Sequence, residues 1–108
     1  MIPESLLARF RNGELVAVVV QDNKTREVLM LAWVNQVALE KTIESGLATF
    51  WSRSRNEIWV KGSKSGNTQK IVSIKLDCDS DALLYSVDPA GPACHNGTIT
   101  CFDVEIRG

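Results

Sequence analysis

The chain has only one histidine, one tyrosine and three cysteines among its 108 residues, and it has no long apolar run. A bilayer-spanning helix needs about 20 consecutive apolar residues, so none is expected. The first five residues also lack the basic, apolar and cleavage regions of a secretory signal. We therefore expect a soluble cytoplasmic protein with no membrane partner.

The cysteines are odd in number, and they form no C-x-x-C pair. In a reducing compartment an odd count favours free thiols or metal ligands over disulfides. The missing C-x-x-C pair excludes a zinc ribbon and a thioredoxin-like redox motif. At 108 residues, 44% of them apolar, we expect one domain spanning residues 1–108. So short a chain leaves much of its surface exposed, which favours a partner subunit.

The net charge of −1 hides an internal asymmetry. Residues 53–75 hold six basic side chains and one acidic one, whereas residues 76–108 hold one basic and six acidic side chains. A basic segment followed by an acidic one suits a ligand with phosphates at one end and a metal at the other. The alternative is that the two segments pair with each other across a sheet.

Apolar periodicity predicts a mostly antiparallel β domain, of the α+β class, with one main helix. The predicted strands cover residues 15–20, 27–33, 48–52, 58–60, 71–77, 82–87 and 99–106. Asn35 is predicted to cap a helix that ends near Ser45, with Gly46 in the left-handed position after it and with Leu39 and Ile43 on one face.

For two of these strands, the sequence predicts which side chains share a face. In the strand over 71–77, the residues Val72, Ile74 and Leu76 are expected on one apolar face. If that strand continues, Cys78 lies on the apolar face and the aspartates that flank it lie on the polar face. The strand over 99–106 is expected to place Phe102, Val104 and Ile106 on one face and Cys101 on the other.

The cysteines and the histidine fall within a short stretch of the chain. Cys94 follows a Gly-Pro turn, directly precedes His95, and is separated from Cys101 by a segment containing Gly97. Thiolates suit zinc, and three of them leave one position open for water, as in a catalytic site. The alternative is that each cysteine is a small buried hydrophobe, which the apolar-face position favours for Cys78. His95 is a metal ligand, a general base or a surface residue; if three thiolates hold zinc, the base role suits it best.

Three aspartates, Asp77, Asp79 and Asp81, alternate around Cys78. The spacing resembles an EF-hand loop, but Ala82 stands where that loop needs glycine and Asp88 where it needs glutamate. Crowded carboxylates repel one another, and a hard cation such as magnesium relieves the repulsion. A solvated acidic edge that discourages strand pairing is the open alternative.

The basic segment has the composition of an anion site. Arg53 and Arg55 lie within Ser52-Arg53-Ser54-Arg55, and a glycine-rich loop follows at 61–68. Arginine forks and exposed loop amides both bind phosphate. Trp51 and Trp59 interleave with the basic residues, as in nucleic-acid-binding proteins, but the stretch is short and the remainder is neutral to acidic, so no nucleic-acid partner is expected.

Taken together, these segments resemble the phosphoribosyl-AMP cyclohydrolase family over nearly the whole chain, in the family's order. The resemblance rests on Val28 to Asn35, Phe50 to Arg55, Ile58 to Gly62, Ser65 to Gln69, Asp77 to Leu84, Gly91 to Gly97 and Cys101-Phe102. Lys64 stands where the family commonly has threonine, and Val34 where methionine is common.

The resemblance implies hydrolysis of the N1–C6 bond of the adenine ring in N1-(5-phosphoribosyl)-AMP, the third step of histidine biosynthesis. It implies a barrel-like sheet capped by a helix, in an intertwined homodimer whose zinc is shared between subunits. The implied residues are Cys78, Cys94 and Cys101 for zinc; Asp77, Asp79 and Asp81 for magnesium; His95 for catalysis; and Trp51, Ser52, Arg53, Ser54, Arg55, Lys61, Gly62, Ser65, Gly66, Asn67 and Thr68 for the phosphorylated nucleotide substrate.

Some relatives carry a second domain that hydrolyses phosphoribosyl-ATP, an activity not expected of residues 1–108. A function of a different class also stays open: a closed structural zinc module that binds nucleotides or RNA without chemistry.

Overall fold

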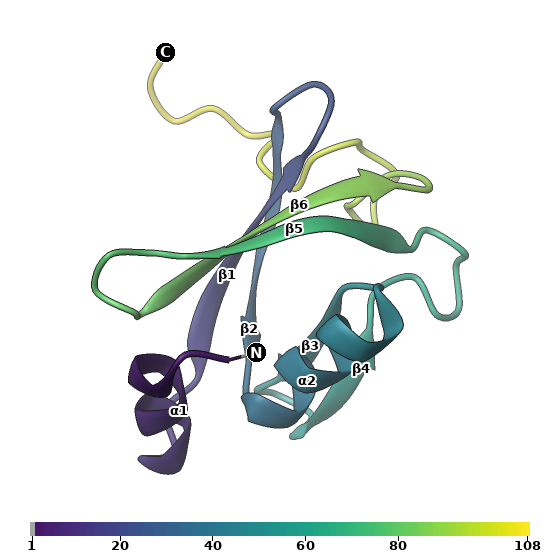
Figure 1. Ribbon diagram of the computed structural model, residues 1–108. Coiled ribbons are helices and arrows are strands. Elements are labelled where there is room, and N and C mark those ends of the chain that lie inside the picture. Colours follow the sequence, from purple (N-terminus) through teal and green to yellow (C-terminus); the bar gives the residue numbers. More distant parts are fainter. Residues whose placement is uncertain (1) are drawn as a thin grey trace.

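The computed structural model describes residues 2–108 as two helices and six strands (Figure 1). In chain order the elements are α1 (Glu4–Arg11), β1 (Val16–Asp22), β2 (Val28–Val34), α2 (Gln36–Ser45), β3 (Thr49–Ser52), β4 (Glu57–Val60), β5 (Gln69–Leu76) and β6 (Ala82–Pro89). Neither helix of this described part is long and apolar enough to cross a membrane.

The strands form a four-stranded sheet, in the order β2-β1-β6-β5, and a separate two-stranded sheet of β3 and β4. β1 and β2 form an antiparallel hairpin, and β5 and β6 form a second one, but β1 and β6 run parallel. The larger sheet is not closed, because β2 and β5 remain its edges. The α+β class is therefore confirmed, and the described residues show no barrel-like closure.

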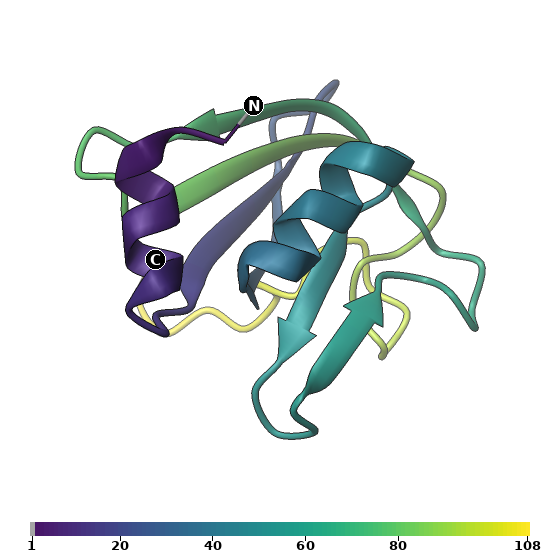
Figure 2. The ribbon, with the colours of Figure 1, turned by 60° about the horizontal axis from the view of Figure 1, so that its bottom comes forward.

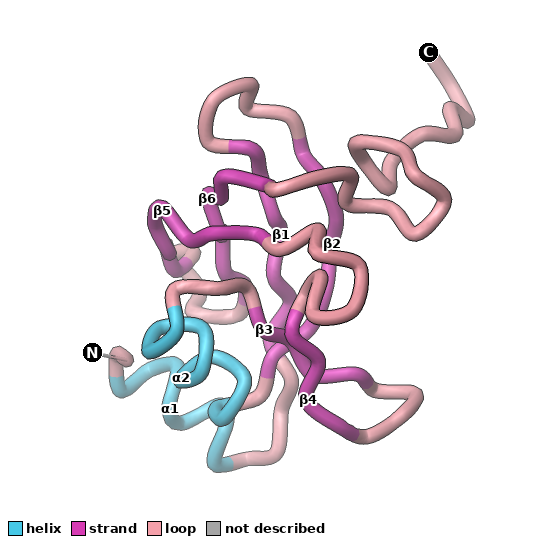
Figure 3. The backbone as a smooth tube through the Cα atoms, turned by 90° about the vertical axis from the view of Figure 1, so that its right-hand side faces the viewer, coloured by secondary structure: helices cyan, strands magenta, loops and turns pink. Residues whose placement is uncertain are grey.

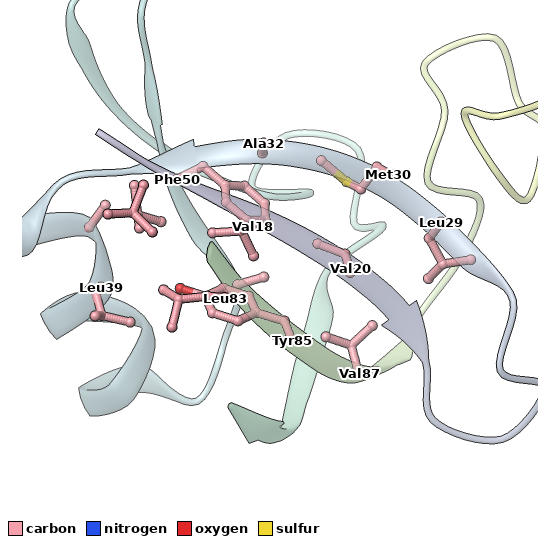
Figure 4. Close-up of a cluster of buried hydrophobic side chains, with 14 of the residues drawn as sticks. Val18, Val20, Leu29, Met30, Ala32, Leu39, Phe50, Leu83, Tyr85 and Val87 are labelled. Carbon is pink, nitrogen blue, oxygen red and sulfur yellow. The ribbon is translucent and has the colours of Figure 1, made fainter. Parts of the chain in front are cut away.

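The core lies between the larger sheet, the smaller sheet and α2 (Figure 4). Alternate valines of β1, Val16, Val18 and Val20, are buried, as period-two alternation requires of a strand that covers a core. Phe50 of β3 stacks at 6.0 Å on Tyr85 of β6, which links the two sheets.

The predicted ends of α2 are confirmed. The Asn35 side chain accepts a hydrogen bond of 2.9 Å from the Ala38 amide, and Gly46 has a φ of 73°. The predicted buried face is only half right, because Leu39 is buried but Ile43 is 48% exposed. Thr42 is buried instead, and its hydroxyl bonds backbone atoms of Ala38 and Thr49, which attaches α2 to β3.

The predicted facing of β5 is wrong at two positions. A bulge between Ile71 and Ser73 shifts the register, so Val72 is 47% exposed while Ile71 joins the residues packed on the core. β5 also ends at Leu76, and Cys78 lies exposed in the turn that follows rather than on an apolar face. The exposed position also excludes the buried-hydrophobe interpretation of this cysteine.

The end of the chain and its beginning also differ from the sequence prediction. Residues 99–106 form no strand (Figure 3). The side chains of Phe102, Val104 and Ile106 are exposed. The backbone contact that this segment makes with the sheet is the 2.7 Å bond from the Cys101 amide to Leu29. Helix α1 was not predicted; its N-cap residue is Pro3, which makes no side-chain capping bond, and the helix buries only Leu6.

Candidate metal centre and substrate cleft

The three aspartates and Cys78 share the tight turn that joins β5 to β6. The Asp77 carboxylate accepts a 3.0 Å bond from the Asp81 amide, and Ser80 adopts a φ of 58°. Ligand atoms of Asp77, Cys78 and Asp79 all lie within 4.8 Å of one another. The turn therefore gathers donor atoms from residues that the sequence prediction placed on two faces of a strand.

The carboxylates of this turn interact strongly. Hydrogen bonds from the backbone, first that of Asp81, lower the pKa of Asp77. The pKa of Asp81 is raised, first by its hydrogen bond with Asp77, then by desolvation and by the negative charges of Asp77 and Asp79. A cation would relieve this repulsion, so the donor set fits a hard ion such as magnesium.

Helix α1 holds the turn in place. Arg9 donates a hydrogen bond to the carbonyl oxygen of Asp79, and the Ser80 hydroxyl donates one of 2.8 Å to that of Ser5. Arg9 is itself oriented by a 3.1 Å ion pair with Glu14. In Figure 2 the turn lies beside α1, at the end of the β5–β6 hairpin.

The other two cysteines lie in the segment after β6. A turn closed by the 2.9 Å bond from the Gly97 amide carries Cys94, and the bond to Leu29 anchors Cys101 against β2. The Cys94 and Cys101 thiols lie close enough for each to shift the pKa of the other. A pair of adjacent thiols fits a soft ion such as zinc.

The two thiols have opposite pKa shifts. The pKa of Cys94 is lowered, first by a hydrogen bond from the Asn96 backbone and then by the Thr98 side chain. Burial raises the pKa of Cys101, the neighbouring Cys94 raises it further, and Lys61 acts against both. Cys94 is thus the thiol that ionises first.

Cys78 does not join this pair within one chain. Cys78 precedes β6 in the chain and Cys94 follows β6, so the eight residues of this strand lie between the two cysteines. At about 3.3 Å per residue, the strand separates its two ends by roughly 20 Å, whereas zinc–sulfur bonds are about 2.3 Å long. Figure 1 shows the 77–81 turn and the segment after β6 at opposite ends of the sheet. One chain alone therefore offers two of the three predicted zinc ligands at one place.

A cleft of about 800 Å³ opens beside Cys101. The cleft is lined by Met30, Leu31, Ala32, Trp33, Trp51, Ser52, Arg53, Ser54, Arg55, Trp59, Cys101 and Phe102. All five of the predicted substrate residues from 51 to 55 are thus brought together with a predicted zinc ligand. Such a combination of aromatic walls and few polar groups is typical of a small-molecule site.

The predicted substrate loop at 61–68 lies elsewhere. The Lys61 ammonium donates to the Ala93 carbonyl oxygen, next to Cys94. A methyl group at Gly91 would collide with the Asn67 side chain, and one at Gly62 with the Asn67 backbone. The Lys61 bond and the close approach of Asn67 to Gly91 join the loop to the segment that delivers Cys94. A role of the loop in substrate binding stays a prediction.

His95 is exposed at the tip of the turn after Cys94.

Trp33 is a cleft residue to which the sequence reasoning assigned no role. The sequence feature that could have identified Trp33 is its position in β2. There it alternates with the buried residues Ala32 and Val34, so its side chain faces outward.

Comparison with known proteins places these residues in a family. The sequence profile described as phosphoribosyl-AMP cyclohydrolase matches residues 30–103. A protein named phosphoribosyl-AMP cyclohydrolase from Cenarchaeum symbiosum is 57% identical over 90 residues, which cover 83% of each chain. One of the same name from Thermobifida fusca is 57% identical over 91 residues, 84% of this chain and 78% of the relative.

A longer relative is also similar. The Bacteroides thetaiotaomicron protein named histidine biosynthesis bifunctional protein HisIE is 56% identical over 91 residues, which are 84% of this chain but 44% of the relative. The profile match includes both candidate metal groups and the cleft, whereas α1 precedes it.

Proposed function

The chain belongs to the phosphoribosyl-AMP cyclohydrolase family, and on this premise we propose that it hydrolyses N1-(5-phosphoribosyl)-AMP in histidine biosynthesis. The bond broken is N1–C6 of the adenine ring, and the ring opens. The observation that carries the proposal is the position of Cys101, which lines the arginine-bearing cleft and lies near enough to Cys94 for the two thiols to shift each other's pKa. A metal held by these thiols would therefore lie at the edge of a cleft that suits a phosphorylated nucleotide.

The proposed active form is a homodimer. Cys94 and Cys101 of one chain and Cys78 of a second copy would hold one zinc ion, because β6 keeps Cys78 away from the other two within a chain. The exposure of Cys78 and of the apolar residues Phe102, Val104 and Ile106 supports a partner surface. Three thiolates leave a fourth position for water, as a catalytic zinc site requires.

When bound, zinc would supply Lewis acidity that makes water reactive near neutral pH. Three thiolates donate more charge to zinc than three imidazoles do, which weakens the Lewis acidity of the ion. Proton transfer from water to a nearby base then becomes more important. His95 adjoins Cys94 in the chain, and its exposed imidazole is proposed to take the proton from the attacking water. Ribosylation at N1 makes C6 electron-poor, so that carbon is the one attacked.

The remaining polar residues bind and orient the substrate. Arg53 and Arg55 project from the β3–β4 turn into the cleft, where their guanidinium groups are proposed to bind phosphate. Asp77, Asp79 and Asp81 would hold magnesium, which would supply positive charge to offset the negative charge of the substrate phosphates. In the proposed dimer, the second copy's Cys78 brings its aspartate turn to the same site.

The test is direct. The protein, loaded with zinc and magnesium, is incubated with N1-(5-phosphoribosyl)-AMP, and ring opening is followed by absorbance and by a product mass one water heavier than the substrate. Turnover is expected. A flat trace from folded, metal-loaded protein would refute the proposal and would leave a zinc module that binds nucleotides without chemistry.

A further inference from the structure

Trp33 and Arg53 come from different parts of the fold and meet at the cleft. The guanidinium carbon of Arg53 lies 4.6 Å from the centroid of the Trp33 ring. Trp33 belongs to β2 of the larger sheet, whereas Arg53 belongs to the turn after β3 of the smaller one. This is the separation at which a cation is attracted to the face of an indole.

We propose that Trp33 is a positioning residue that holds the Arg53 guanidinium in the cleft, ready for a phosphate of the substrate. The proposal deepens the proposed function and rests on it, because it identifies the residue that orders one of the phosphate-binding side chains. Trp33 is proposed to act through Arg53, without itself contacting the substrate.

Stacking on an aromatic ring can leave the binding edge of an arginine free. A guanidinium that lies over a ring uses its face, while its N–H groups point outward in the plane. The ion pairs within residues 2–108 are Arg9–Glu14, Arg11–Glu4 and Arg55–Glu57, so Arg53 takes part in none of them. Its fork is therefore available for a bidentate contact with an oxyanion.

The support of Trp33 is itself rigid. β2 is hydrogen-bonded to β1 along its length, and the residues on both sides of Trp33, Ala32 and Val34, are buried. The residue opposite Trp33 on β1 is Ala17, whose methyl group is too small to cover an indole. A fixed aromatic platform reduces the rotamer freedom that Arg53 must lose on binding.

Arg55 provides an internal comparison, because it is held differently. Its Nη1 lies 3.8 Å from a carboxylate oxygen of Glu57, and both side chains are more than half exposed. Such a surface pair orders a side chain weakly. The two arginines are adjacent to the same cleft, yet only Arg53 rests on an aromatic ring.

The first measurement needs neither substrate nor metal. In the ¹H–¹⁵N spectrum of the arginine side chains, the Arg53 Nε–Hε resonance should be displaced by the ring current of Trp33. The resonance is assigned by its loss in Arg53→Ala. The displacement should survive in Trp33→Phe, although reduced, and vanish in Trp33→Leu. An undisplaced resonance in the wild type would overturn the proposal.

The second measurement is a pair of double-mutant cycles, which combine Trp33→Leu with Arg53→Ala and with Arg55→Ala. Each cycle measures the affinity for AMP and the KM and kcat for N1-(5-phosphoribosyl)-AMP. Trp33→Leu is expected to weaken AMP binding and raise KM by about three- to tenfold, with kcat nearly unchanged. In an Arg53→Ala background the same change should have no further effect. In an Arg55→Ala background it should keep its full effect.

The outcomes distinguish this proposal from its rivals. If Trp33→Leu weakens binding equally in the Arg53→Ala background, the indole contacts the ligand directly and the positioning role is wrong. Thermal unfolding of each variant, and rescue of affinity by Trp33→Phe, separate positioning from loss of fold. If the wild type binds AMP and shows the displaced resonance but does not open the ring, the proposed function fails while the Trp33–Arg53 relationship stands.

Discussion

Arg9 of α1 donates a 3.0 Å hydrogen bond from Nη2 to the carbonyl oxygen of Asp79, seventy positions further along the chain. The contact attaches a helix outside the family profile to the turn that bears the three aspartates and Cys78. The acidic turn is therefore held by tertiary contacts in addition to its own hydrogen bonds. Its geometry depends on a part of the chain that carries none of the candidate ligands.

Replacement of Arg9 by alanine is expected to loosen this turn. Loss of one hydrogen bond, worth about 1 kcal/mol, should speed hydrogen exchange at the Ser80 and Asp81 amides by about fivefold. The matched control is Arg11→Ala, since Arg11 lies on the same helix but pairs with Glu4 and not with the turn. Equal effects of the two variants would mean that α1 docks without a specific role for Arg9.

The shared zinc site predicts a pattern of complementation between inactive variants. Cys78→Ser, Cys94→Ser and Cys101→Ser should each lose zinc and activity and weaken the dimer. When Cys78→Ser and Cys94→Ser chains are refolded together, a mixed dimer keeps one complete set of thiols. Random pairing then restores zinc and activity to about a quarter of the wild-type level.

The control for complementation is a mixture of Cys94→Ser and Cys101→Ser chains. The structure places these two thiols together in one chain, so no mixed dimer holds an intact set and no zinc should return. Sedimentation measures the dimer in every sample. Recovery in this second mixture, or a wild type that is active as a monomer, would contradict a site shared in this way.

His95→Asn should fold, dimerise and keep its zinc, yet lose about 100- to 10,000-fold in turnover, the usual range for general-base assistance. A base works only when unprotonated, so the wild-type rate should fall toward acid pH. This acidic fall in the pH–rate profile should disappear in the variant. Zinc content is measured beside the rate. Parallel loss of zinc and rate would make His95 a ligand, and survival of both would make it a bystander.

Tyr85 predicts how stability depends on alkaline pH. Burial raises its pKa from the ordinary 10.0 to about 12. The folded state thus keeps the phenol proton longer than the unfolded state, so the contribution of this group is full below pH 10 and is lost as the pH rises toward 12. Relative to Tyr85→Phe, the wild type should lose about 1.4 kcal/mol between pH 9 and pH 11, measured by urea unfolding.

At neutral pH the same variant should be at least as stable as the wild type. Among the described residues the buried Tyr85 hydroxyl has no well-formed hydrogen bond, because the nearby Thr42 hydroxyl is engaged by Ala38 and Thr49. Removal of an unpaired buried hydroxyl eliminates a desolvation cost. A loss of more than about 1 kcal/mol at pH 7 would show that this hydroxyl has a partner after all.

Part of the local structure of this protein could be predicted from its sequence. Asn35 and Gly46 mark the ends of α2 because a side-chain cap and a left-handed residue act within a few positions of the chain. The β1–β2 hairpin likewise follows from two apolar runs around a short turn. The residue types that carry the chemistry, thiols, carboxylates and arginines, were also evident, since their ligand preferences do not depend on the fold.

Only the tertiary structure decided which of these residues meet. Residues 99–106 alternate as a strand does, but a strand needs a hydrogen-bonding neighbour along its length. Within residues 2–108, this segment bonds the backbone of the sheet at Cys101 alone. The length of β6 separates Cys78 from Cys94, and packing of the two sheets brings Arg53 over Trp33. These distances arise from pairing between residues far apart in the chain, which no local pattern encodes.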